Sequence, residues 1–391
     1  MSFRFSMPTA VECGCGISDN LGEYVRRMGC RTAFIVTDPG IRKAGLLDKM
    51  AASLDREHIT YDIFDEVDPN PSAQHMEKGA DAWRARRYEC VIAVGGGSSI
   101  DTAKGVAAMA TNPGSILDYE GVGKLPHATV PLIVVPTTAG TGSEVTSATI
   151  VTNTEQKFKA AVISPHLFPS LALLDALLTL KLPQPLTAAT GMDALTHAIE
   201  SYTSKAASPV SQGMALQAVR MIGRHLTRAY FTGTDVESRE QMLVASMIAG
   251  AAFSQSRLGN VHAISHTLGG VFNIPHGVAN AALLPYVMEF NLPACPGRMK
   301  EIAEALGEDT RGLSEEEGGK KAIAAILRMN RSMGIPSNIK DLGVSLDWLP
   351  KLVEDSMRSG NVLINPRLTG PDDIRRIIEN AFHGVLEHHY S

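Results

Sequence analysis

The sequence predicts an α/β domain with a parallel sheet, followed by an all-α domain. In the first half, short β-branched runs alternate with helical periodicities, and this pattern is typical of a parallel sheet with right-handed crossovers. From about residue 183 onward the periodicity is helical and β-branched runs are few. Two prolines in Leu182-Pro183-Gln184-Pro185 separate the alternating pattern from the helical pattern. We therefore expect domains at 1–182 and 183–391.

Apolar runs in the first half have the composition of buried strands. They are Thr32–Thr37, Thr60–Phe64, Cys90–Val94, Pro131–Val135 and Ala148–Thr152. We predict a helix over Ala44–Leu54, after a break at Asp38-Pro39-Gly40, and another that Ser72 caps and that ends at about Arg87. Breaks in the second half fall at Ser208-Pro209, Gly259-Asn260, Pro275-His276-Gly277 and Pro293 to Gly297.

Composition limits the functions to be considered. Of the 391 residues, 44% are hydrophobic and 20% charged, so two sizeable cores can be filled. With 36 Lys plus Arg against 41 Asp plus Glu, the net charge of −5 gives no electrostatic reason to expect nucleic acid or an anionic membrane as partner. The five cysteines are scattered, and neither an export signal nor a membrane-spanning run is recognisable. We expect a cytoplasmic protein without a membrane partner.

A glycine turn marks a candidate phosphate site. Gly95, Gly96, Gly97 and Ser98 follow an apolar strand and precede a helical pattern. Bare N–H groups at such a helix start meet the positive end of the helix dipole, where glycine lets a phosphate approach. The spacing matches neither Gly-x-Gly-x-x-Gly nor a P-loop. The alternative is a tight turn in which Ser98 caps the helix.

Two further features favour a dinucleotide. Asp38 ends the first strand, where a carboxylate can accept hydrogen bonds from a ribose diol and repel a 2′-phosphate, so NAD is favoured over NADP. The segment from Pro136 to Glu144 follows another strand and places hydroxyl side chains between glycines. It can form a second wall against phosphates and sugar. A capped turn is the alternative for this segment.

A histidine-rich constellation in the second half predicts a metal site. Asp193 and His197 are four residues apart on a predicted helix, His262 and His266 repeat that spacing, and His276 follows a turn. One such pair alone is more often an ordinary helix contact. Apolar neighbours imply burial, which is costly for uncoordinated imidazoles and carboxylates. Nitrogen and oxygen ligands suit ferrous iron or zinc. The spacing does not decide between His262 and His266 as the ligand.

Together these motifs resemble the iron-containing (group III) alcohol dehydrogenase family. The resembling segments are 95–101, 136–144, 190–200, 261–270 and 273–280, and the resemblance extends from Phe5 to Arg367. It implies a dehydroquinate-synthase-like fold, with an N-terminal dinucleotide-binding domain, a C-terminal helical domain and a catalytic metal in the cleft between them. It also implies NAD, a divalent metal ion (Fe²⁺, with Zn²⁺ as the alternative), a small primary alcohol or aldehyde as substrate, and a homodimer.

The resemblance also implies roles for single residues. The metal ligands would be Asp193, His197, His262 and His276, and His266 would be a nearby catalytic histidine that assists proton movement. The cofactor would contact Asp38, Asn70, Gly95, Gly96, Gly97, Ser98, Asp101, Thr137, Thr138, Thr141, Ser143, Lys159 and Leu178, the last as a wall of the nicotinamide pocket.

One segment departs from the family pattern. Ser254-Gln255-Ser256-Arg257 stands where the family usually has small or neutral residues. A cation at Arg257, close to a metal ligand, raises the alternative that the aldehyde carries a carboxylate, sulfonate or phosphonate tail. A structural ion pair or a solvated arginine is the simpler explanation. Phe253, just before this segment, is the other candidate substrate contact.

Two competing classes remain at this point. Metal-dependent polyol dehydrogenases and dehydroquinate-synthase-like proteins have a similar layout but another ligand set, and the Asp193/His197 pair argues against them. A non-catalytic metal-binding scaffold protein could keep a buried His/Asp cluster for stability alone. The intact cofactor loops argue against a scaffold.

Overall fold

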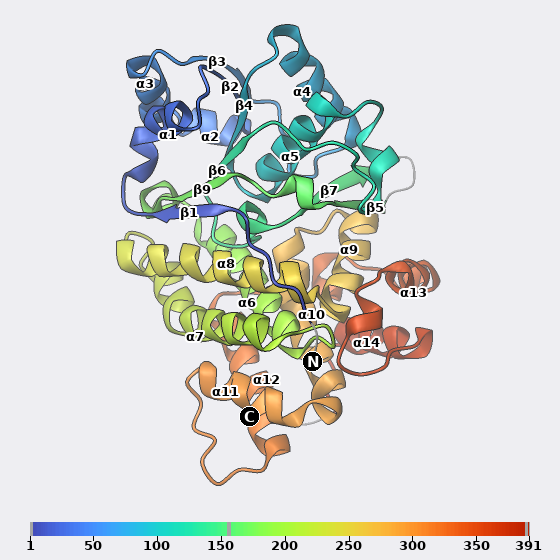
Figure 1. Cartoon of the computed structure of the whole chain (residues 1–391). Coiled ribbons are helices and arrows are strands. Elements are labelled where there is room, and N and C mark those ends of the chain that lie inside the picture. The colour runs from blue at the N-terminus through green and yellow to red at the C-terminus, as the bar shows by residue number, and fades with distance from the viewer. Residues whose placement is uncertain (1–2, 155–157, 388–389, 391) are drawn as a thin grey trace. The chain divides into compact units, whose positions relative to one another are not determined.

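The computed structural model describes residues 3–154, 158–387 and 390, and the chain divides into two compact units (Figure 1). One unit is Met7–Lys181. The other begins at Leu182 and includes the first segment of the chain, up to Ser6. Gln255 of α8 (Val236–Ser256) holds this segment by donating to the carbonyl of Ser6 at 2.8 Å and accepting from its N–H at 3.2 Å.

The N-terminal unit contains a six-stranded sheet in the order β1-β9-β6-β4-β2-β3. The strands are β1 (Ala10–Cys13), β2 (Thr32–Val36), β3 (Thr60–Phe64), β4 (Cys90–Gly95), β6 (Leu132–Pro136) and β9 (Leu171–Leu174). All of its described pairings are parallel. The predicted parallel α/β fold is confirmed.

Helices cover both faces of this sheet. They are α1 (Leu21–Arg27), α2 (Pro39–Lys43), α3 (Asp48–Arg56), α4 (Ala73–Arg86) and α5 (Gly97–Thr111). Ile35 of β2 packs in one core cluster with residues of α1 and α3, whereas its neighbour Phe34 packs in another with residues of α4 and α5. Because successive side chains of a strand point to opposite faces, a sheet covered on both sides needs continuous apolar runs. This explains why β2, β3, β4 and β6 are recognisable in the sequence; β1 and β9, of four residues each, were not predicted.

A second, smaller sheet has the order β5-β8-β7. It consists of β5 (Gly121–Val122), β7 (Ala148–Asn153) and β8 (Phe158–Ile163), and β7 pairs with β8 in antiparallel fashion. The predicted strand at Ala148–Thr152 is thus confirmed as a strand, but it belongs to this separate sheet rather than to the parallel one.

The predicted helix over Ala44–Leu54 is wrong in its start. The structure has α2 before it, and α3 begins only at Asp48. Asp38 caps α2, because its Oδ1 accepts the N–H of Ile41 at 3.0 Å, and Pro39 suits the first helical turn. The Asp-Pro-Gly sequence is therefore a helix start rather than a break.

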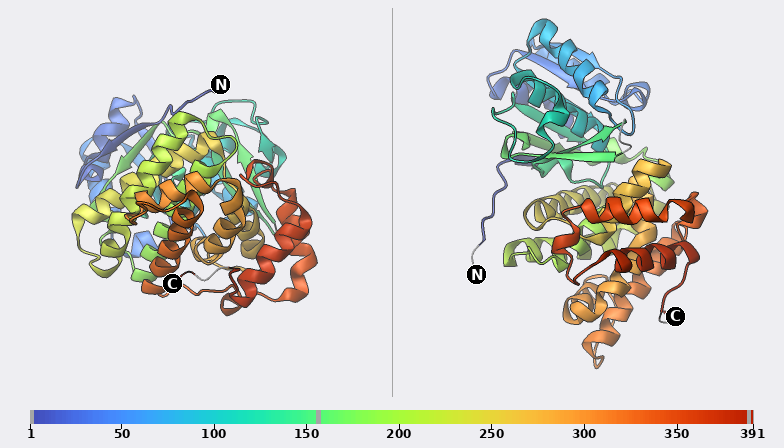
Figure 2. Two further views of the ribbon diagram at one scale, coloured as in Figure 1. Left: turned by 90° about the horizontal axis from the view of Figure 1, so that it is seen from below. Right: turned by 90° about the vertical axis from the view of Figure 1, so that its right-hand side faces the viewer.

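In the second unit all regular secondary structure among the described residues is helical (Figures 1 and 2), as predicted. Its α-helices are α6 (Gln184–Thr203), α7 (Pro209–Phe231), α8 (Val236–Ser256), α9 (Asn260–Phe272), α10 (His276–Asn291), α11 (Pro296–Ala305), α12 (Glu315–Ser332), α13 (Leu349–Arg358) and α14 (Pro371–His383). The predicted breaks coincide with the starts of α7, α9, α10 and α11. None of the described helices is long and apolar enough to cross a membrane.

Short 3-10 helices occupy several connections. They are η1 (Ile17–Asn20), η2 (Ile116–Tyr119), η3 (Ser143–Val145), η4 (Pro165–Leu167), η5 (Ala176–Thr179), η6 (Leu292–Ala294), η7 (Lys340–Leu342), η8 (Leu346–Trp348) and η9 (Val362–Ile364). Of these, η3 and η5 carry residues of the candidate cofactor site.

Candidate active site

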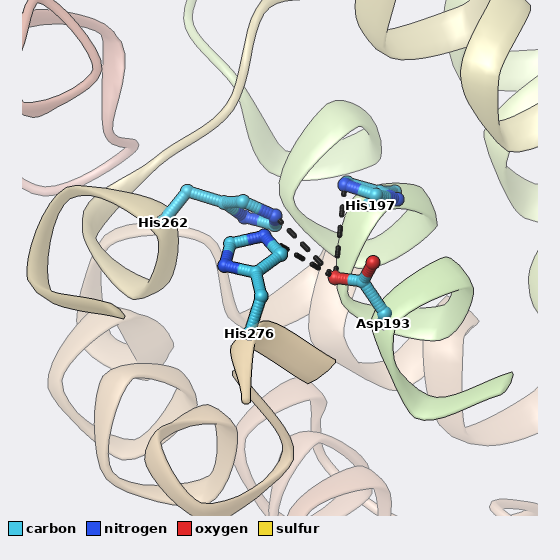
Figure 3. A group of neighbouring side chains, drawn as sticks. All are labelled: Asp193, His197, His262 and His276. Carbon is cyan, nitrogen blue, oxygen red and sulfur yellow. Dashed lines mark ion pairs between the residues drawn. The ribbon is translucent and has the colours of Figure 1, made fainter. Parts of the chain in front are cut away.

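Three helices of the second unit bring the predicted metal ligands together (Figure 3). Asp193 and His197 lie one turn apart on α6 and so share a face. His262 comes from the first turn of α9, and His276 is the first residue of α10. One ligand atom from each residue lies within 4.8 Å of the other three.

Asp193 is the centre of this cluster. Its Oδ1 lies 3.8 Å from Nε2 of His197 and 3.7 Å from Nε2 of both His262 and His276. Three of the four side chains are at most 6% exposed, whereas that of His276 is 28% exposed. Solvent therefore reaches the cluster at His276.

Backbone features around α10 place His276. Asn273 ends α9 in the left-handed conformation, with φ of 56°, which asparagine tolerates better than most residues. At Gly277 an added Cβ would lie 2.2 Å from the carbonyl oxygen of Ala189 on α6. The glycine after His276 therefore lets α10 start directly against the helix that carries Asp193.

The charges of the cluster are strongly coupled. Burial alone would raise the pKa of Asp193, but His197, His276 and His262 outweigh burial and hold that pKa below its usual range. Burial alone would lower the pKa of His262, but Glu200 and Asp193 outweigh it and raise that pKa to about 9. The first shift favours the ionised carboxylate of Asp193, and the second favours a positive charge on His262, so each group stabilises the opposite charge of the other.

Asn280 provides a test of whether a metal ion fits here. Its side chain is fully buried, and its Nδ2 donates to Asp193 Oδ1 at 2.6 Å. The same nitrogen lies 3.1 Å from Nε2 of His262 and of His276, while Asn280 Oδ1 has no hydrogen-bond partner among the described residues. The lone pairs of Asp193, His262 and His276 thus point toward one electropositive group, the Asn280 amide nitrogen, as they would point toward a metal ion. Three imidazole nitrogens and a carboxylate oxygen fit Fe²⁺ or Zn²⁺.

Phe253 and His266 lie beside the cluster. The Phe253 ring packs against His197 with 4.5 Å between ring centroids, and the side chain is half-buried. His266, one turn after His262 on α9, stacks on His276 at 5.2 Å and is also half-buried. Both rings are therefore close enough to contact a ligand of the same pocket.

Arg257 has a different environment. It follows α8 with φ of 62°, and its side chain is exposed. Its guanidinium lies against Gly360, where an added Cβ would be 2.5 Å from Nη2. Arg257 thus packs beside Gly360 and is not one of the four residues of the cluster.

Glu200 is a functional candidate that the sequence reasoning missed. It is buried at the end of α6, its Oε2 lies 2.6 Å from Nδ1 of His262, and its Oε1 accepts the N–H of Val261 at 2.7 Å. The available signal was its spacing, since residues 193, 197 and 200 share one helix face.

The predicted cofactor residues lie in the N-terminal unit, mainly where parallel strands end. Asp38 follows β2, Gly96 and Gly97 follow β4, and Thr137 follows β6. The carboxyl ends of parallel strands share one edge of the sheet, which is the usual position of a nucleotide site. Asp38 lies beside the glycine turn, because its Oδ2 accepts the Ser99 hydroxyl at 3.2 Å.

The start of α5 has the features of an anion site. Gly96 is its N-cap, and no described side chain caps the helix. Its first N–H groups therefore lack side-chain acceptors, as a site for phosphate requires. Ser98 is not the cap, because its hydroxyl donates to the carbonyl of Pro69 at 2.6 Å. That bond holds the turn with Asn70 beside the glycine loop.

Close packing joins the glycine loop to the hydroxyl-rich loop after β6. A Cβ on Gly97 would lie 2.6 Å from Cγ2 of Thr141, and one on Gly96 would lie 3.4 Å from Thr138. Gly95 has φ of 151°, in the region that favours glycine. The glycines thus permit both a backbone conformation and a close approach.

A buried network braces the same loops. Ser143 donates to Asp101 Oδ1 at 2.8 Å, and Lys104 Nζ donates to Ser143 Oγ at 3.1 Å and to the carbonyls of Thr146 and Ala148 at 2.9 and 2.8 Å. Burial lowers the pKa of Lys104 to about 8. Sequence reasoning missed Lys104; its signal was a lysine just before the apolar run 106–110 of the predicted helix.

Lys159 and Leu178 complete the predicted cofactor set. Lys159 pairs with Thr152 across the β7–β8 ladder, and its charge lowers the pKa of Asp101 against the larger, opposite effect of burial. Leu178, in η5 after β9, is half-buried and packs against the core cluster that includes α1 and α3. Both lie in the same unit as the glycine loop.

Comparisons with known proteins agree over nearly the whole chain. The profile "Iron-containing alcohol dehydrogenase" matches residues 8–176, and "Fe-containing alcohol dehydrogenase family, C-terminal" matches 187–382. A 1,3-propanediol dehydrogenase of Citrobacter freundii is 42% identical over 382 residues, covering 97% of this chain and 99% of that protein. An NAD-dependent methanol dehydrogenase of Bacillus methanolicus is 39% identical over 378 residues, covering 97% and 99%.

A solved structure gives the same result. The crystal structure of a 1,3-propanediol oxidoreductase is similar with a TM-score of 0.95 and 42% identity, covering 98% of this chain and 100% of that one. Fold and cluster thus define the class of metal-dependent dehydrogenases. The chain belongs to the iron-containing alcohol dehydrogenase family, which confirms the resemblance of the motifs. It is an oxidoreductase that interconverts alcohols and aldehydes.

Proposed function

We propose that this enzyme interconverts a small primary alcohol and its aldehyde, with NAD as hydride carrier and Fe²⁺ as the bound metal ion. The observation that carries the proposal is the convergence of four donor atoms within 4.8 Å, from three helices, in a largely buried place. The names of the similar proteins, which include an NAD-dependent methanol dehydrogenase, support the cofactor and the size of the substrate.

The metal would be held by Asp193, His197, His262 and His276. When bound, a divalent ion supplies a Lewis acid that polarises the oxygen of the alcohol or aldehyde. His266 takes the alcohol proton through water and passes it toward solvent, because it is half-buried and stacks on the partly exposed His276. Zn²⁺ is the alternative ion for this ligand set.

Phe253 forms an apolar wall for the substrate. It packs against a ligand, His197, and leaves part of its ring accessible. An aromatic surface there accommodates a short carbon chain and excludes water from the reacting carbon. Arg257 is exposed against Gly360, so we favour a neutral substrate over one with an anionic tail.

The cofactor would bind along the strand ends of the N-terminal unit. The first N–H groups of α5, with Gly95 to Ser98, hold the pyrophosphate, and Asp38 accepts from the adenosine ribose. Thr137, Thr138, Thr141, Asn70, Lys159 and Leu178 complete the cofactor contacts. Asp101 and Ser143 act by bracing these loops, since they bond to one another.

The test is a turnover assay on protein of known metal content. The metal of the purified enzyme is measured, removed with a chelator and replaced with Fe²⁺ without oxygen, or with Zn²⁺. We expect metal-dependent reduction of NAD⁺, read from NADH absorbance, with short primary alcohols and 1,3-propanediol. Binding of cofactor and metal without turnover of any alcohol or aldehyde would favour the scaffold alternative.

The substrate class is tested with Arg257→Ala. We expect kcat/KM for butanal and for succinic semialdehyde to change by the same factor, because the side chain is exposed. A selective loss for the anionic aldehyde would establish Arg257 as an anion-binding residue.

We also propose a homodimer in the cytoplasm. β1 ends the order of the six-stranded sheet, so one of its edges has no strand partner within the described chain and can pair with a second copy. Cys30, Cys90 and Cys295 are buried thiols suited to a reducing compartment. Light scattering of the purified protein and fractionation of cells test the two statements.

A further inference from the structure

A buried carboxylate next to the metal cluster has no role in the function described above. Glu200 ends the same helix face as Asp193 and His197, and its side chain is 4% exposed. Its Oε2 lies 2.6 Å from His262 Nδ1, and its Oε1 accepts the N–H of Val261 at 2.7 Å. Burying a carboxylate is costly unless it is paired and hydrogen-bonded, so these two contacts account for its presence in the interior.

The first contact determines which nitrogen of His262 carries a proton. A carboxylate can only accept, so Nδ1 must donate, and in a neutral imidazole Nε2 then keeps its lone pair. Nε2 is the atom that lies 3.7 Å from Asp193 Oδ1. In the other tautomer a lone pair would face the carboxylate, and the Nε2 proton would occupy the direction of the ligand bond.

The second contact determines where His262 is. Gly259, the N-cap of α9, has no side chain with which to satisfy the first N–H groups of the helix. Glu200 accepts from Val261, and Asn365 Oδ1 accepts from the N–H of Asn260 at 3.4 Å. A carboxylate is also favoured at this end of the helix dipole. Glu200 therefore fixes the first turn of α9, which carries His262.

We propose that Glu200 is a positioning residue of the metal site, which holds His262 in the metal-binding tautomer and location. The inference rests on the proposed function, because it concerns the same metal ion. Glu200 bonds to Nδ1 of His262 rather than to its ligand atom Nε2, so it acts on the metal site through His262. Helix α6 thus supplies two ligands directly and orients a third from another helix. A carboxylate in this position also raises the basicity of the imidazole.

A merely structural role makes a different prediction. If Glu200 only capped α9, its loss would lower the stability of the metal-free protein and leave the intrinsic affinity for the metal unchanged. If it positions His262, metal affinity falls even when the metal-free fold is intact. Loss of such an outer partner typically weakens metal binding about 10- to 100-fold.

The decisive variant is Glu200→Gln. Glutamine has the same length, but its single oxygen can accept from Val261 or from His262, not from both. An NH₂ group facing His262 favours the tautomer that cannot bind through Nε2. The control is Glu289→Gln on α10, another buried carboxylate of this unit, which accepts from the Tyr390 hydroxyl at 2.8 Å and from the N–H of Glu387 at 3.1 Å.

A second variant disturbs the same contact without changing a charge. An added Cβ at Gly259 would lie 2.9 Å from Glu200 Oε1 and 3.1 Å from Asn365 Oδ1. Its φ of −127° is accessible to alanine. Gly259→Ala therefore displaces the Glu200 carboxylate while the carboxylate remains present, and a smaller loss of affinity in the same direction is expected.

Three measurements start from metal-stripped protein, which is loaded with Zn²⁺ for the last of them. Zn²⁺ affinity is obtained by competition with a chromogenic chelator, stability by urea unfolding without metal, and the His262 tautomer by ¹⁵N NMR of the Zn²⁺-loaded enzyme. We expect Glu200→Gln to weaken Zn²⁺ binding about 10- to 100-fold and to remove or shift the Nδ1–H signal. Glu289→Gln should bind Zn²⁺ with an affinity within about twofold of that of the wild type, because Glu289 is not an outer partner of a metal ligand.

The outcomes separate this inference from the function on which it rests. Wild-type Zn²⁺ affinity in Glu200→Gln, or an unchanged Nδ1–H signal, would overturn the role of Glu200 alone. If the wild type binds no Zn²⁺ and Asp193→Asn makes no difference, the proposed function fails. If Glu200→Gln does not fold, Gly259→Ala decides: weaker Zn²⁺ binding supports the inference and unchanged binding overturns it.

Discussion

The two units build their sites from different parts of the chain. In the N-terminal unit the candidate cofactor site is mainly backbone: a glycine turn, the first N–H groups of α5 and short hydroxyl side chains that pack against them. In the helical unit the candidate metal site is made of long side chains from three helices, held by further buried side chains. The first site should be damaged by added atoms, and the second by removed donors.

Removing a donor from the metal cluster should have the largest effect. Asp193→Asn replaces the one carboxylate shared by the three histidines with a neutral amide. Several kcal/mol of transition-state stabilisation are lost with the ion, which corresponds to about a thousandfold lower kcat/KM. Metal content, measured by mass spectrometry, should fall in parallel.

The control for this variant is His225→Ala. This half-buried histidine lies on α7, 3.5 Å from the Ser238 hydroxyl, and does not belong to the cluster. We expect its metal content to match that of the wild type. Full metal content in Asp193→Asn would contradict the ligand assignment, even if activity were lost.

Adding an atom to the glycine loop should have the next largest effect. Gly97→Ala places a Cβ 2.6 Å from Thr141 Cγ2, so the two loops must separate. Overpacking of this kind costs about 1–3 kcal/mol, and we therefore expect NAD binding to weaken about tenfold. Calorimetry with NAD⁺ measures this, and the Zn²⁺ affinity of the helical unit should not change.

Gly213→Ala is the matched substitution in the helical unit. Nothing lies within 4 Å of a Cβ at this position of α7, so alanine should stabilise the helix by up to about 1 kcal/mol. Equal losses of NAD affinity in both variants would show that close packing at Gly97 is not what shapes the cofactor loop.

The same contrast explains how much the sequence predicts. Four strands of the parallel sheet, β2, β3, β4 and β6, are recognisable from their apolar or β-branched runs, whereas the short β1 and β9 were not predicted. The four-residue spacing of Asp193 and His197 places both on one face of α6. The small sheet was not predicted, since β8 was missed and β5, which pairs with β8 from far away in the chain, has only two residues. Asp38-Pro39-Gly40 does end the strand run, but the helix that starts there was missed because Asp, Pro and Gly occur both in breaks and at capped helix starts.

Outer partners are harder to predict than ligands. Glu200 and Asn280 contact His262 from two other helices, and no local pattern in the sequence predicts a contact between residues so far apart in the chain. Lys104 is similar, because a buried lysine looks like any helix lysine until its four acceptors are known. Composition and spacing in the sequence therefore indicate the metal ligands, whereas the buried residues that hydrogen-bond to such groups are known only from the tertiary structure.

A buried charge makes the hydroxyl-rich loop sensitive to pH. Burial raises the pKa of Glu144, in η3, from its usual 4.5 to about 7, although a backbone hydrogen bond and Lys104 oppose this. The folded state then binds more protons than the unfolded state between pH 4.5 and 7, so stability falls as the pH rises through that window.

Glu144→Gln removes this dependence because glutamine resembles the protonated acid. At about 1.4 kcal/mol per pKa unit, we expect the variant to be up to about 3 kcal/mol more stable at pH 8 and similar to the wild type at pH 5. Urea unfolding at a series of pH values gives the difference. Parallel curves for both proteins would show that Glu144 does not titrate in this window.

The smallest expected effect concerns the choice of cofactor, and the structure improves the design of its test. Asp38 caps α2 as well as standing at the proposed ribose site, so glycine there would remove a cap along with the charge. Asp38→Asn keeps an oxygen for the Ile41 N–H and removes only the charge. A like-charge pair near 4 Å costs at least about 1 kcal/mol, so we expect the preference for NAD over NADP to fall by about tenfold. The ratio of kcat/KM for the two cofactors measures it, and an unchanged ratio would place the ribose away from Asp38.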